Sequence, residues 1–568
     1  MFTVPDKLKL LTYLQFISWF LAALIISYQH DLCVPPLNIN PSSTYIRILS
    51  HDLLWLVLDI NADMHHESEG KLPALTTLRR VSQVSSFWRE VALSASSLWG
   101  KIINLNQLNQ KTCYWRNEVL RRSGKSPLCV QRMTGKKKAN SYFFAIILND
   151  HWGRKRRLDL DPWGEIDYIG HQVAIDLFSQ PAPFLEKFNV PTFYHSGVIG
   201  EGYRSFSDKA PCLRSFKHFI TSGQMPSHLR APWMPQLRSL FLTHRISARQ
   251  LLNALSSTPL LEDLTARFQL TKDPNPTPLP VVMLPRLNRL YFDAAGAREW
   301  IDILSKLTPA VECSLRFVLT LDYSQSPLTA ADISGAFSLL SDYFDRHFNT
   351  RENLSVGLHF MAHGFDLFDN ETTPITRVES SETDLEAFDF LLALASTYPG
   401  SSLSSAFLGS ICLHNWHKVE TLDLLVENYL DYSNINFIKF LSSLTSLKLL
   451  VVRPRTLQLL LDSMFASPDV LLPCLRQLRY VPDKARPNSP VLGVFLTLRK
   501  RIGYPIDVLE ITDFHVANRT FRYLDAILGL TVVWWFKGAL KEYHCGSGTP
   551  EVLDFTHSKK YFNHEGRF

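Results

Sequence analysis

The sequence lacks paired cysteines. Its eight cysteines are spread along 568 residues, and no two of them form a Cys-x-x-Cys pair. Disulfide-dense secreted domains and zinc-stapled domains both need cysteines at short, regular spacing. We therefore expect reduced thiols, no disulfide framework, and a cytoplasmic or nuclear protein.

The sequence also lacks the common catalytic motifs. It contains no Gly-x-Ser-x-Gly elbow, no glycine-rich dinucleotide turn and no protein-kinase set. The Gly-Lys-Ser at 124–126 is not preceded by the glycine of a phosphate loop, because Val119 stands there. Cys412, His414 and His417 have no partner pair at zinc spacing. These absences predict a chain that is not an enzyme and has no metal and no cofactor.

A strong charge of one sign is missing too. The chain has 59 basic and 53 acidic residues, a net charge of +6. That excess is too small for this length to indicate a nucleic-acid partner. With 46% hydrophobic and 20% charged residues, the composition is that of a globular protein, long enough for several domains or for one repeat array.

Two stretches near the N-terminus predict short helices. Residues 49–59 form one, in which the Ser50 hydroxyl can cap the helix and Asp52 suits its positive end. Residues 79–99, RRVSQVSSFWREVALSASSLW, carry apolar positions at three- and four-residue steps, which indicates a helical pair with one apolar face. Trp88 and Trp99 stand eleven residues apart in it.

This second stretch resembles the second half of the F-box of basidiomycete-type fungal proteins. The positions that match are Leu78, Val81, Val84, Trp88, Arg89, Ala92, Leu93, Leu98 and Trp99. The first half departs from the family, which opens with Leu-Pro-Pro-Glu, because Leu49 to Asp52 contain no proline. The resemblance covers about 55 of the 568 residues.

The resemblance implies a non-catalytic, substrate-recruiting subunit of an SCF-type cullin-RING ubiquitin ligase. The F-box would dock on the Skp-family adaptor and reach the cullin through it, while the rest of the chain would bind an unknown protein substrate. Buried apolar side chains would carry the docking, although Trp88 and Trp99 could instead fill the F-box's own core. The residues expected to bind the adaptor are Leu49, Leu53, Leu54, Val84, Trp88 and Trp99.

Residues 181–540 repeat a Leu-x-x-Leu-x-Leu skeleton at steps of 24 to 31 residues, in or near the period of leucine-rich repeats. The first five copies begin at Leu185, Leu213, Leu237, Leu261 and Leu287, and the later four at Val419, Leu444, Leu475 and Ile506. Helical stretches such as 248–256, 297–307, 457–465 and 491–501 lie between the copies. The Asn or Cys usual at the ninth repeat position is absent, and residues 315–413 are poorly periodic.

A strand-helix unit of this size cannot bury its own apolar face, so neighbouring units must stack. The predicted fold is therefore α/β, with an N-terminal helical F-box followed by an irregular leucine-rich-repeat solenoid. An ordinary α/β domain is the alternative. The predicted segments are an N-terminal extension (1–44), the F-box (45–101), a connecting region (102–180), the solenoid (181–540) and a C-terminal tail (541–568).

The connecting region should hold a helix over 114–122, ended by Ser123 and Gly124, and a strand over 128–133. Residues 141–148 are continuously apolar and are interpreted as a strand-like or buried segment.

An uncharged run of 18 residues, 10–27, follows Lys7 and Lys9 and is just long enough to span a bilayer. It contains Leu10, Phe16, Trp19, Leu24 and Ile26. The alternatives are a buried apolar helix or an extension unrelated to the working protein. A membrane association through this run motivates a second hypothesis for function, a membrane-tethered or scaffold repeat protein without ligase coupling.

Overall fold

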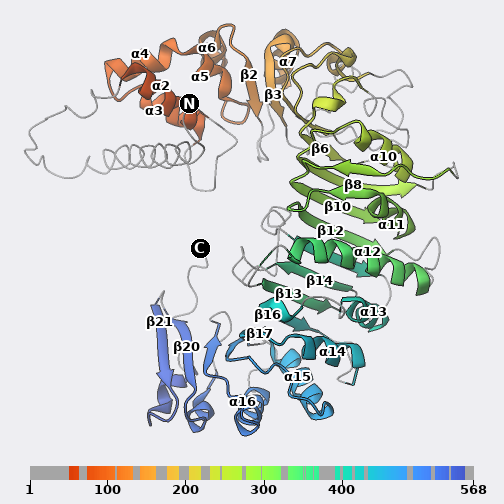
Figure 1. Cartoon of the computed structure of the whole chain (residues 1–568). Helices are drawn as coiled ribbons and strands as arrows, with labels where there is room; N and C mark the ends of the chain where they lie inside the picture. Colours follow the sequence, from red (N-terminus) through yellow and green to blue (C-terminus); the bar gives the residue numbers. More distant parts are fainter. Residues whose placement is uncertain are drawn as a thin grey trace, which may run out of the picture. The chain divides into compact units, whose positions relative to one another are not determined.

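The chain folds into two compact units, residues 1–240 and 241–568, in a computed structural model (Figure 1). The structure describes residues 50–62, 73–108, 110, 112–131, 141–160, 176–190, 204–218, 231–243, 246–271, 277–295, 297–321, 330–349, 351, 354–361, 364–369, 390–396, 401–411, 416–427, 433–482, 490–512, 519–536 and 539–556.

The described part of unit 1 begins with four short helices, of which the first three pack on one another. These are α2 (His51–Asn61), α3 (Ala74–Val81), α4 (Ser86–Ser94) and α5 (Ser96–Lys101). Ser50 caps α2 through its side chain, as its sequence position predicts, and Ser85 caps α4. The apolar faces meet in a core of Leu54, Val57, Leu58, Leu75, Leu78, Val81, Trp88 and Val91. The helical prediction for this region is confirmed.

Parallel strands follow in unit 1, each paired with the next. They are β1 (Ile103–Asn104), β2 (Leu128–Gln131), β3 (Lys155–Asp159), β4 (Lys187–Val190) and β5 (Ser215–His218), and β6 (Ser239–Leu242) lies at the unit's end. Helix α6 (Tyr114–Ser123) ends at Gly124 with φ of 50°, as expected for a glycine in this position. The parallel strands therefore start well before residue 181, where the sequence predicts the beginning of the solenoid.

One segment, expected to be strand-like or buried, is a helix in which Ile147 and Leu148 are buried. Residues Ser141–Asp150 form helix α7, because a continuous apolar run has no period that separates a buried strand from a buried helix. Beyond it, the described residues include 3₁₀ turns at Trp152–Arg154, Ser205–Asp208 and Met234–Gln236. A continuous series of aromatic contacts, mostly tilted or edge to face, runs from Trp152 through Phe178, Phe188, Phe206 and Phe216 to Trp233.

Unit 2 alternates strands and helices, and Figure 1 shows the helices along one side of its strands. The strands are β7 (Ile246–Ser247), β8 (Asp263–Thr271), β9 (Val282–Leu284), β10 (Arg289–Ala295), β11 (Leu307–Pro309), β12 (Ser314–Leu321), β13 (Leu354–Met361), β14 (Gly364–Asp369), β15 (Phe390–Ser396), β16 (Val419–Val426), β17 (Leu449–Val452), β18 (Gln477–Tyr480), β19 (Val508–Ile511), β20 (Thr531–Phe536) and β21 (Ala539–His544). The helices are α10 (Ala248–Ser256), α11 (Ala297–Lys306), α12 (Ala330–Asn349), α13 (Ser401–Ile411), α14 (Ile435–Ser443), α15 (Pro454–Ala466) and α16 (Val491–Arg501), with 3₁₀ turns Trp416–Lys418, Arg522–Ala526 and Pro550–Leu553.

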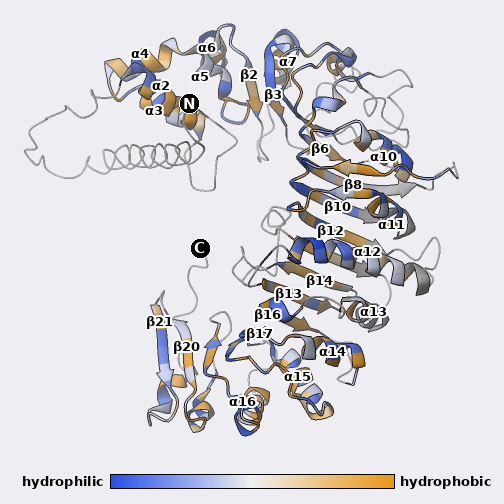
Figure 2. Cartoon of the chain, in the orientation of Figure 1, coloured by the Kyte–Doolittle hydropathy of each residue, from blue (hydrophilic) through white to orange (hydrophobic). Residues whose placement is uncertain are grey.

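The repeated skeleton lines the buried side of these strands, as predicted. Leu264 pairs in register with Leu290, and Leu290 with Leu315. Farther along, Leu478 pairs with Leu509, and all of these leucines are buried. Figure 2 shows the hydrophobic colour along the strands. The prediction of a mixed α/β chain with parallel strands is therefore confirmed.

The structure moves one copy of the predicted skeleton three residues toward the C-terminus. The pairing of β17 places Leu450 beside Leu422 and Leu478, and Val452 beside Leu424 and Tyr480. The repeat is therefore Leu447, Leu450 and Val452, not Leu444, Leu447 and Leu449, and Leu449 lies half-buried on the other side. A run of closely spaced leucines, LSSLTSLKLL, fits both registers, and only the strand pairing selects one.

The poorly periodic middle is a reordered segment of the sheet. Strand β12 pairs in parallel with β15, and β13 pairs in parallel with β16. Strand β14 lies between β13 and β15 and is antiparallel to both. At Gly357 on β13 a Cβ atom would lie 2.1 Å from the ring of Phe368, so a larger residue would force that ring to move. After β12 the chain passes over the positions of β15 and β14, forms β13, and then returns through β14 to β15. Neighbouring strands of the sheet are therefore not consecutive in the sequence here, which explains why the regular repeat is lost.

Buried side chains replace the missing asparagines of the repeat. The Arg499 guanidinium donates to the carbonyls of Leu471, Leu472 and Leu475 at 2.9 to 3.3 Å. The Tyr343 hydroxyl donates to the carbonyls of Leu304 and Leu307. Buried carbonyls need such donors, so in these two repeats different side chains do what one residue type does in a regular array.

Unit 2 ends in a hairpin, since β20 is parallel to β19 and antiparallel to β21. The edge strand β21 exposes Lys541, Glu542 and His544. Charged side chains on an edge strand discourage pairing with another chain.

Candidate protein-docking site

The candidate site is the helical bundle formed by α2, α3 and α4 in unit 1. Two polar contacts fix the turn between α3 and α4. The Ser85 Oγ accepts from the Trp88 backbone N–H at 3.2 Å, and the Arg89 Nε donates to the Ser82 carbonyl at 3.1 Å. The turn therefore holds Val84 in a defined position between the two helices.

The predicted adaptor-binding residues fall into two groups. Leu54, Trp88 and Trp99 are buried, with 0 to 2% of each residue exposed. Trp99 donates its indole N–H to the Ala92 carbonyl at 2.7 Å, whereas the indole nitrogen of Trp88 has no hydrogen-bond partner among the described residues. These three side chains hold the helices together and do not form the bundle's surface.

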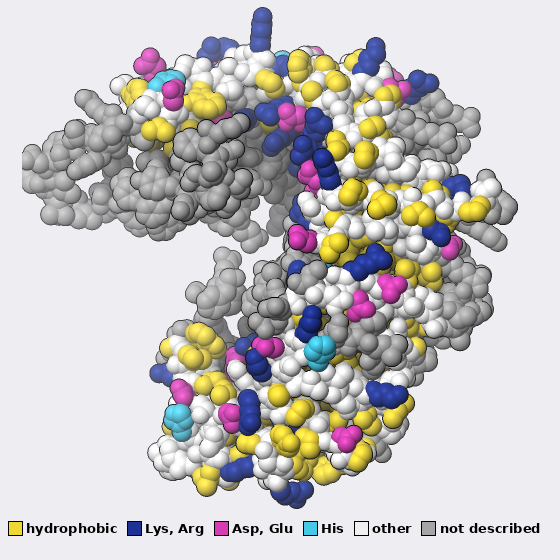
Figure 3. All heavy atoms as spheres, in the orientation of Figure 1, with side chains coloured by type: hydrophobic (Ala, Val, Ile, Leu, Met, Phe, Trp, Pro, Cys, Tyr) yellow, Lys and Arg dark blue, Asp and Glu magenta, His cyan; other side chains and the backbone are white. Residues whose placement is uncertain are grey.

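Leu53 and Val84 form the second group, because 48% and 41% of these residues are exposed. Phe87 and Leu93 on α4 are exposed to 37% each, and Figure 3 shows hydrophobic side chains at the surface over α4. Phe87 was missed in the sequence, although it directly precedes Trp88 and so lies off the buried face of an amphipathic helix. Leu49 lies outside the described residues.

The bundle is joined to the strands of unit 1 through α5 and α6. The rings of Trp99 and Trp115 meet edge to face with centroids 6.1 Å apart, and the Arg122 guanidinium lies 4.6 Å from the Trp99 ring. Ser96 Oγ and Ser126 Oγ are hydrogen-bonded at 2.8 Å. The Arg154 guanidinium donates to the Ser126 carbonyl.

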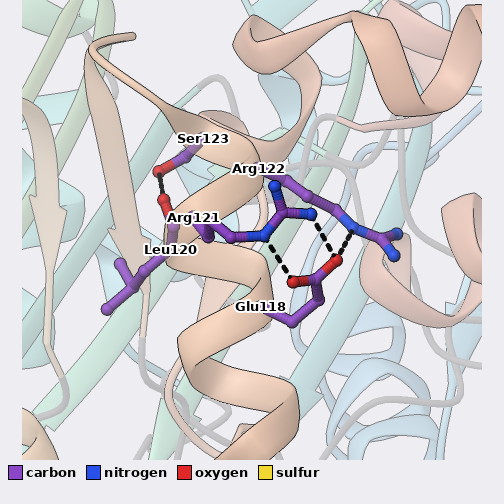
Figure 4. A network of polar contacts seen from close by, with 5 residues as sticks. All are labelled: Glu118, Leu120, Arg121, Arg122 and Ser123. Carbon is purple, nitrogen blue, oxygen red and sulfur yellow. Dashed lines mark hydrogen bonds and ion pairs between the residues drawn. The ribbon is translucent and has the colours of Figure 1, made fainter.

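A carboxylate on α6 fixes two of the arginines (Figure 4). Glu118 accepts from Arg121 at 2.7 and 2.8 Å and from Arg122 at 2.7 Å, while Ser123 Oγ donates to the Leu120 carbonyl. The hydrogen bonds from Arg121 and Arg122 lower the pKa of Glu118 to about 2. The Glu118 carboxylate therefore stays ionised throughout the physiological pH range, and its bond to Arg122 helps to hold that guanidinium over the Trp99 ring.

A second polar cluster lies on the strands of unit 2. His359 Nε2 is 3.4 Å from Asp423 Oδ2, and His359 is paired in register with Asp366 on β14. Burial raises the pKa of Asp366 to about 6, and the nearby His359 opposes this rise. Among the described residues, no group of three or more His, Cys, Asp or Glu side chains is arranged to hold a metal ion.

The hydrophobic run at 10–27 lies outside the described residues, and with it Leu10, Phe16, Trp19, Leu24 and Ile26. Within the part of the chain that is described, we find no helix with both the length and the apolar character that a membrane crossing requires.

Comparison with known proteins adds little. No protein-family model matches the chain, and no curated protein matches it. Among solved structures, it is similar to the leucine-rich repeat-containing protein LegL7 from Legionella pneumophila, with 10% sequence identity over 57% of this chain and 93% of that one, and a TM-score of 0.23. Because that score is low, the description of the repeats rests on their own strand pairing.

Proposed function

We propose that the chain is a substrate-recruiting subunit of an SCF-type ubiquitin ligase, a protein with an F-box followed by irregular leucine-rich repeats. In this proposal the bundle of α2, α3 and α4 docks on a Skp-family adaptor and, through it, on a cullin. The strands that follow bind a protein substrate. The chain contributes proximity between substrate and ubiquitin-conjugating enzyme, not a covalent step.

One observation carries the proposal. The bundle buries Leu54 and Trp88 in its own core and still leaves large apolar side chains in water, notably Leu53 and Phe87. Exposed apolar side chains gathered on a small bundle are typical of protein-docking surfaces. The same chain continues into parallel strands whose exposed side chains vary from repeat to repeat, which suits the recognition of a partner protein.

Co-purification tests this proposal. The full-length chain should capture the Skp-family adaptor and the cullin from cells, as identified by mass spectrometry. Trp88→Ala should abolish capture, because emptying a fully packed tryptophan site costs about 3–5 kcal/mol and collapses the bundle. Unfolding of unit 2, followed by circular dichroism, should stay unchanged.

The outcomes separate the two hypotheses for function. If the wild-type chain captures other proteins reproducibly but neither adaptor nor cullin, the scaffold hypothesis replaces the ligase. If the chain also stays with the membrane fraction after washes in high salt and carbonate, that result would support the membrane-tethered form of the scaffold hypothesis.

A further inference from the structure

Most of the exposed apolar side chains of unit 1 lie on the bundle. In the described part of unit 1, six large apolar side chains are more than a third exposed. Four of them belong to α2, to α4 or to the turn before α4, and we call these four the apolar surface: Leu53, Val84, Phe87 and Leu93. Contact between apolar groups and water is unfavourable, so this surface gains free energy when something covers it.

A second apolar part of the same chain also needs a cover. Residues 10–27 contain no charged residue, and fourteen of these eighteen residues are hydrophobic. A run of this composition is stable only when it is buried, either in a bilayer or against protein. The sequence therefore places two apolar partners close together along the chain, the run and the apolar surface of the bundle.

The charges that flank the run favour protein over a bilayer as its cover. Lys7 and Lys9 precede the run, and no Lys or Arg follows it before Arg47. Lys and Arg beside a membrane-spanning segment favour the cytosolic side. A spanning run would therefore carry the bundle to the opposite side of the membrane, away from a cytosolic adaptor.

The chain between the run and the bundle is long enough for the two to meet. Twenty-two residues, 28–49, separate the run from Ser50, which is the N-cap of α2. A chain of this length can span up to about 70 Å when it is fully extended. Helix α2 has 11 residues and is therefore only about 16 Å long. The run can thus reach every side chain of the apolar surface.

We infer that residues 10–27 pack on the apolar surface of the bundle and compete there with the adaptor. The inference rests on the proposed function, because that proposal assigns the same side chains to adaptor docking. A competitor within the chain weakens binding in proportion to the fraction of chains whose surface is open. If one chain in ten is open, the adaptor binds about tenfold more weakly than it would to the uncovered bundle.

Photo-crosslinking identifies what covers the surface without any adaptor. A photo-crosslinking amino acid replaces Phe87 in the purified full-length chain, which is illuminated, digested and analysed by mass spectrometry. We expect a link from position 87 to residues 10–27 of the same chain. The matched control carries the same amino acid at Val281, which is exposed on unit 2, and should give no link to the run.

Adaptor binding measures the competition. Phe16→Asp/Leu24→Asp places two charges in the run and should release it, because burying unpaired carboxylates is costly. Asn38→Asp/Asn40→Asp adds the same charges to the segment that follows the run and is the matched control. Calorimetric titration should show at least tenfold tighter adaptor binding for the first variant and less than a twofold change for the second. The link from position 87 to the run should be lost only in the first.

Three results would overturn the inference. The first is a link from position 87 to a second copy of the chain, or no link to residues 10–27. The second is equal adaptor affinity of the wild-type chain and the run variant. The third is flotation of the wild-type chain with phosphatidylcholine and phosphatidylserine vesicles together with unchanged crosslinking in the run variant, which would assign the run to a bilayer. If the link forms but no adaptor binds, the ligase proposal fails while the packing of the run on the bundle stands.

Discussion

At the scale of single residues, the buried polar side chains of unit 2 hold the most testable chemistry. Asp366 lies on β14 opposite His359, and burial raises its pKa to about 6. The folded state therefore binds a proton more tightly than the unfolded chain does. Between pH of about 4 and 6 the stability contributed by the protonated form is lost as the pH rises.

Asp366→Asn should make unit 2 more stable at pH 8, by on the order of 1–3 kcal/mol, because the neutral amide avoids the cost of a buried charge. At pH 4, where the native carboxyl is mostly protonated, the two proteins should melt at nearly the same temperature. Thermal unfolding at both pH values measures this. A variant that is less stable at pH 8 would mean that the carboxylate is favourably paired.

A substitution of Arg499 tests whether this side chain takes the role of the asparagine that is missing from the repeat. Arg499→Met removes the donors from three buried carbonyls and should cost about 2–4 kcal/mol, since each unsatisfied buried group carries a penalty of about 1–3 kcal/mol. Arg501→Met on the same helix is exposed and should change stability by less than about 0.5 kcal/mol. Equal effects in urea unfolding would deny the role of these hydrogen bonds.

At the scale of elements, local signals were enough for the caps and for most strands. Ser50 and Gly124 set helix ends through contacts within three or four residues, so the sequence alone predicts them. The helix Ser141–Asp150 was not separable from a strand, because its apolar run has no polar face. The order of β13, β14 and β15 depends on pairing between residues far apart in sequence, which no local pattern encodes.

The corrected register of β17 gives a prediction at this scale. Leu450→Asp should cost several kcal/mol, because Leu450 is 0% exposed and its carboxylate replacement would have no partner. Leu449→Asp should be tolerated to within about 1 kcal/mol, since Leu449 is half-buried on the opposite side. Melting temperatures of the two variants decide between the registers, and a reversed order would restore the Leu444, Leu447 and Leu449 copy.

At the scale of the whole molecule, a helical bundle is followed along the chain by an array of parallel strands and helices. The candidate site could be predicted only in part. The sequence located the bundle and the two tryptophans through their spacing, but burial alone separates Trp88 in the bundle's core and Trp99 on the adjoining α5 from Leu53 and Phe87, which are exposed. A helical period identifies an apolar face and does not say whether a partner or the chain itself covers it.

The central claim is that the exposed side chains of the bundle dock on a Skp-family adaptor. The most direct measurement is a calorimetric titration of purified adaptor into the full-length chain and into Leu53→Asp/Phe87→Asp. Val281→Asp/Val311→Asp is the matched control, because it places the same charges on exposed valines of unit 2. We predict one-to-one binding with a negative heat-capacity change from apolar burial, lost in the first variant and kept in the second. Absence of binding to the wild-type chain, or equal binding by both variants, would contradict the account.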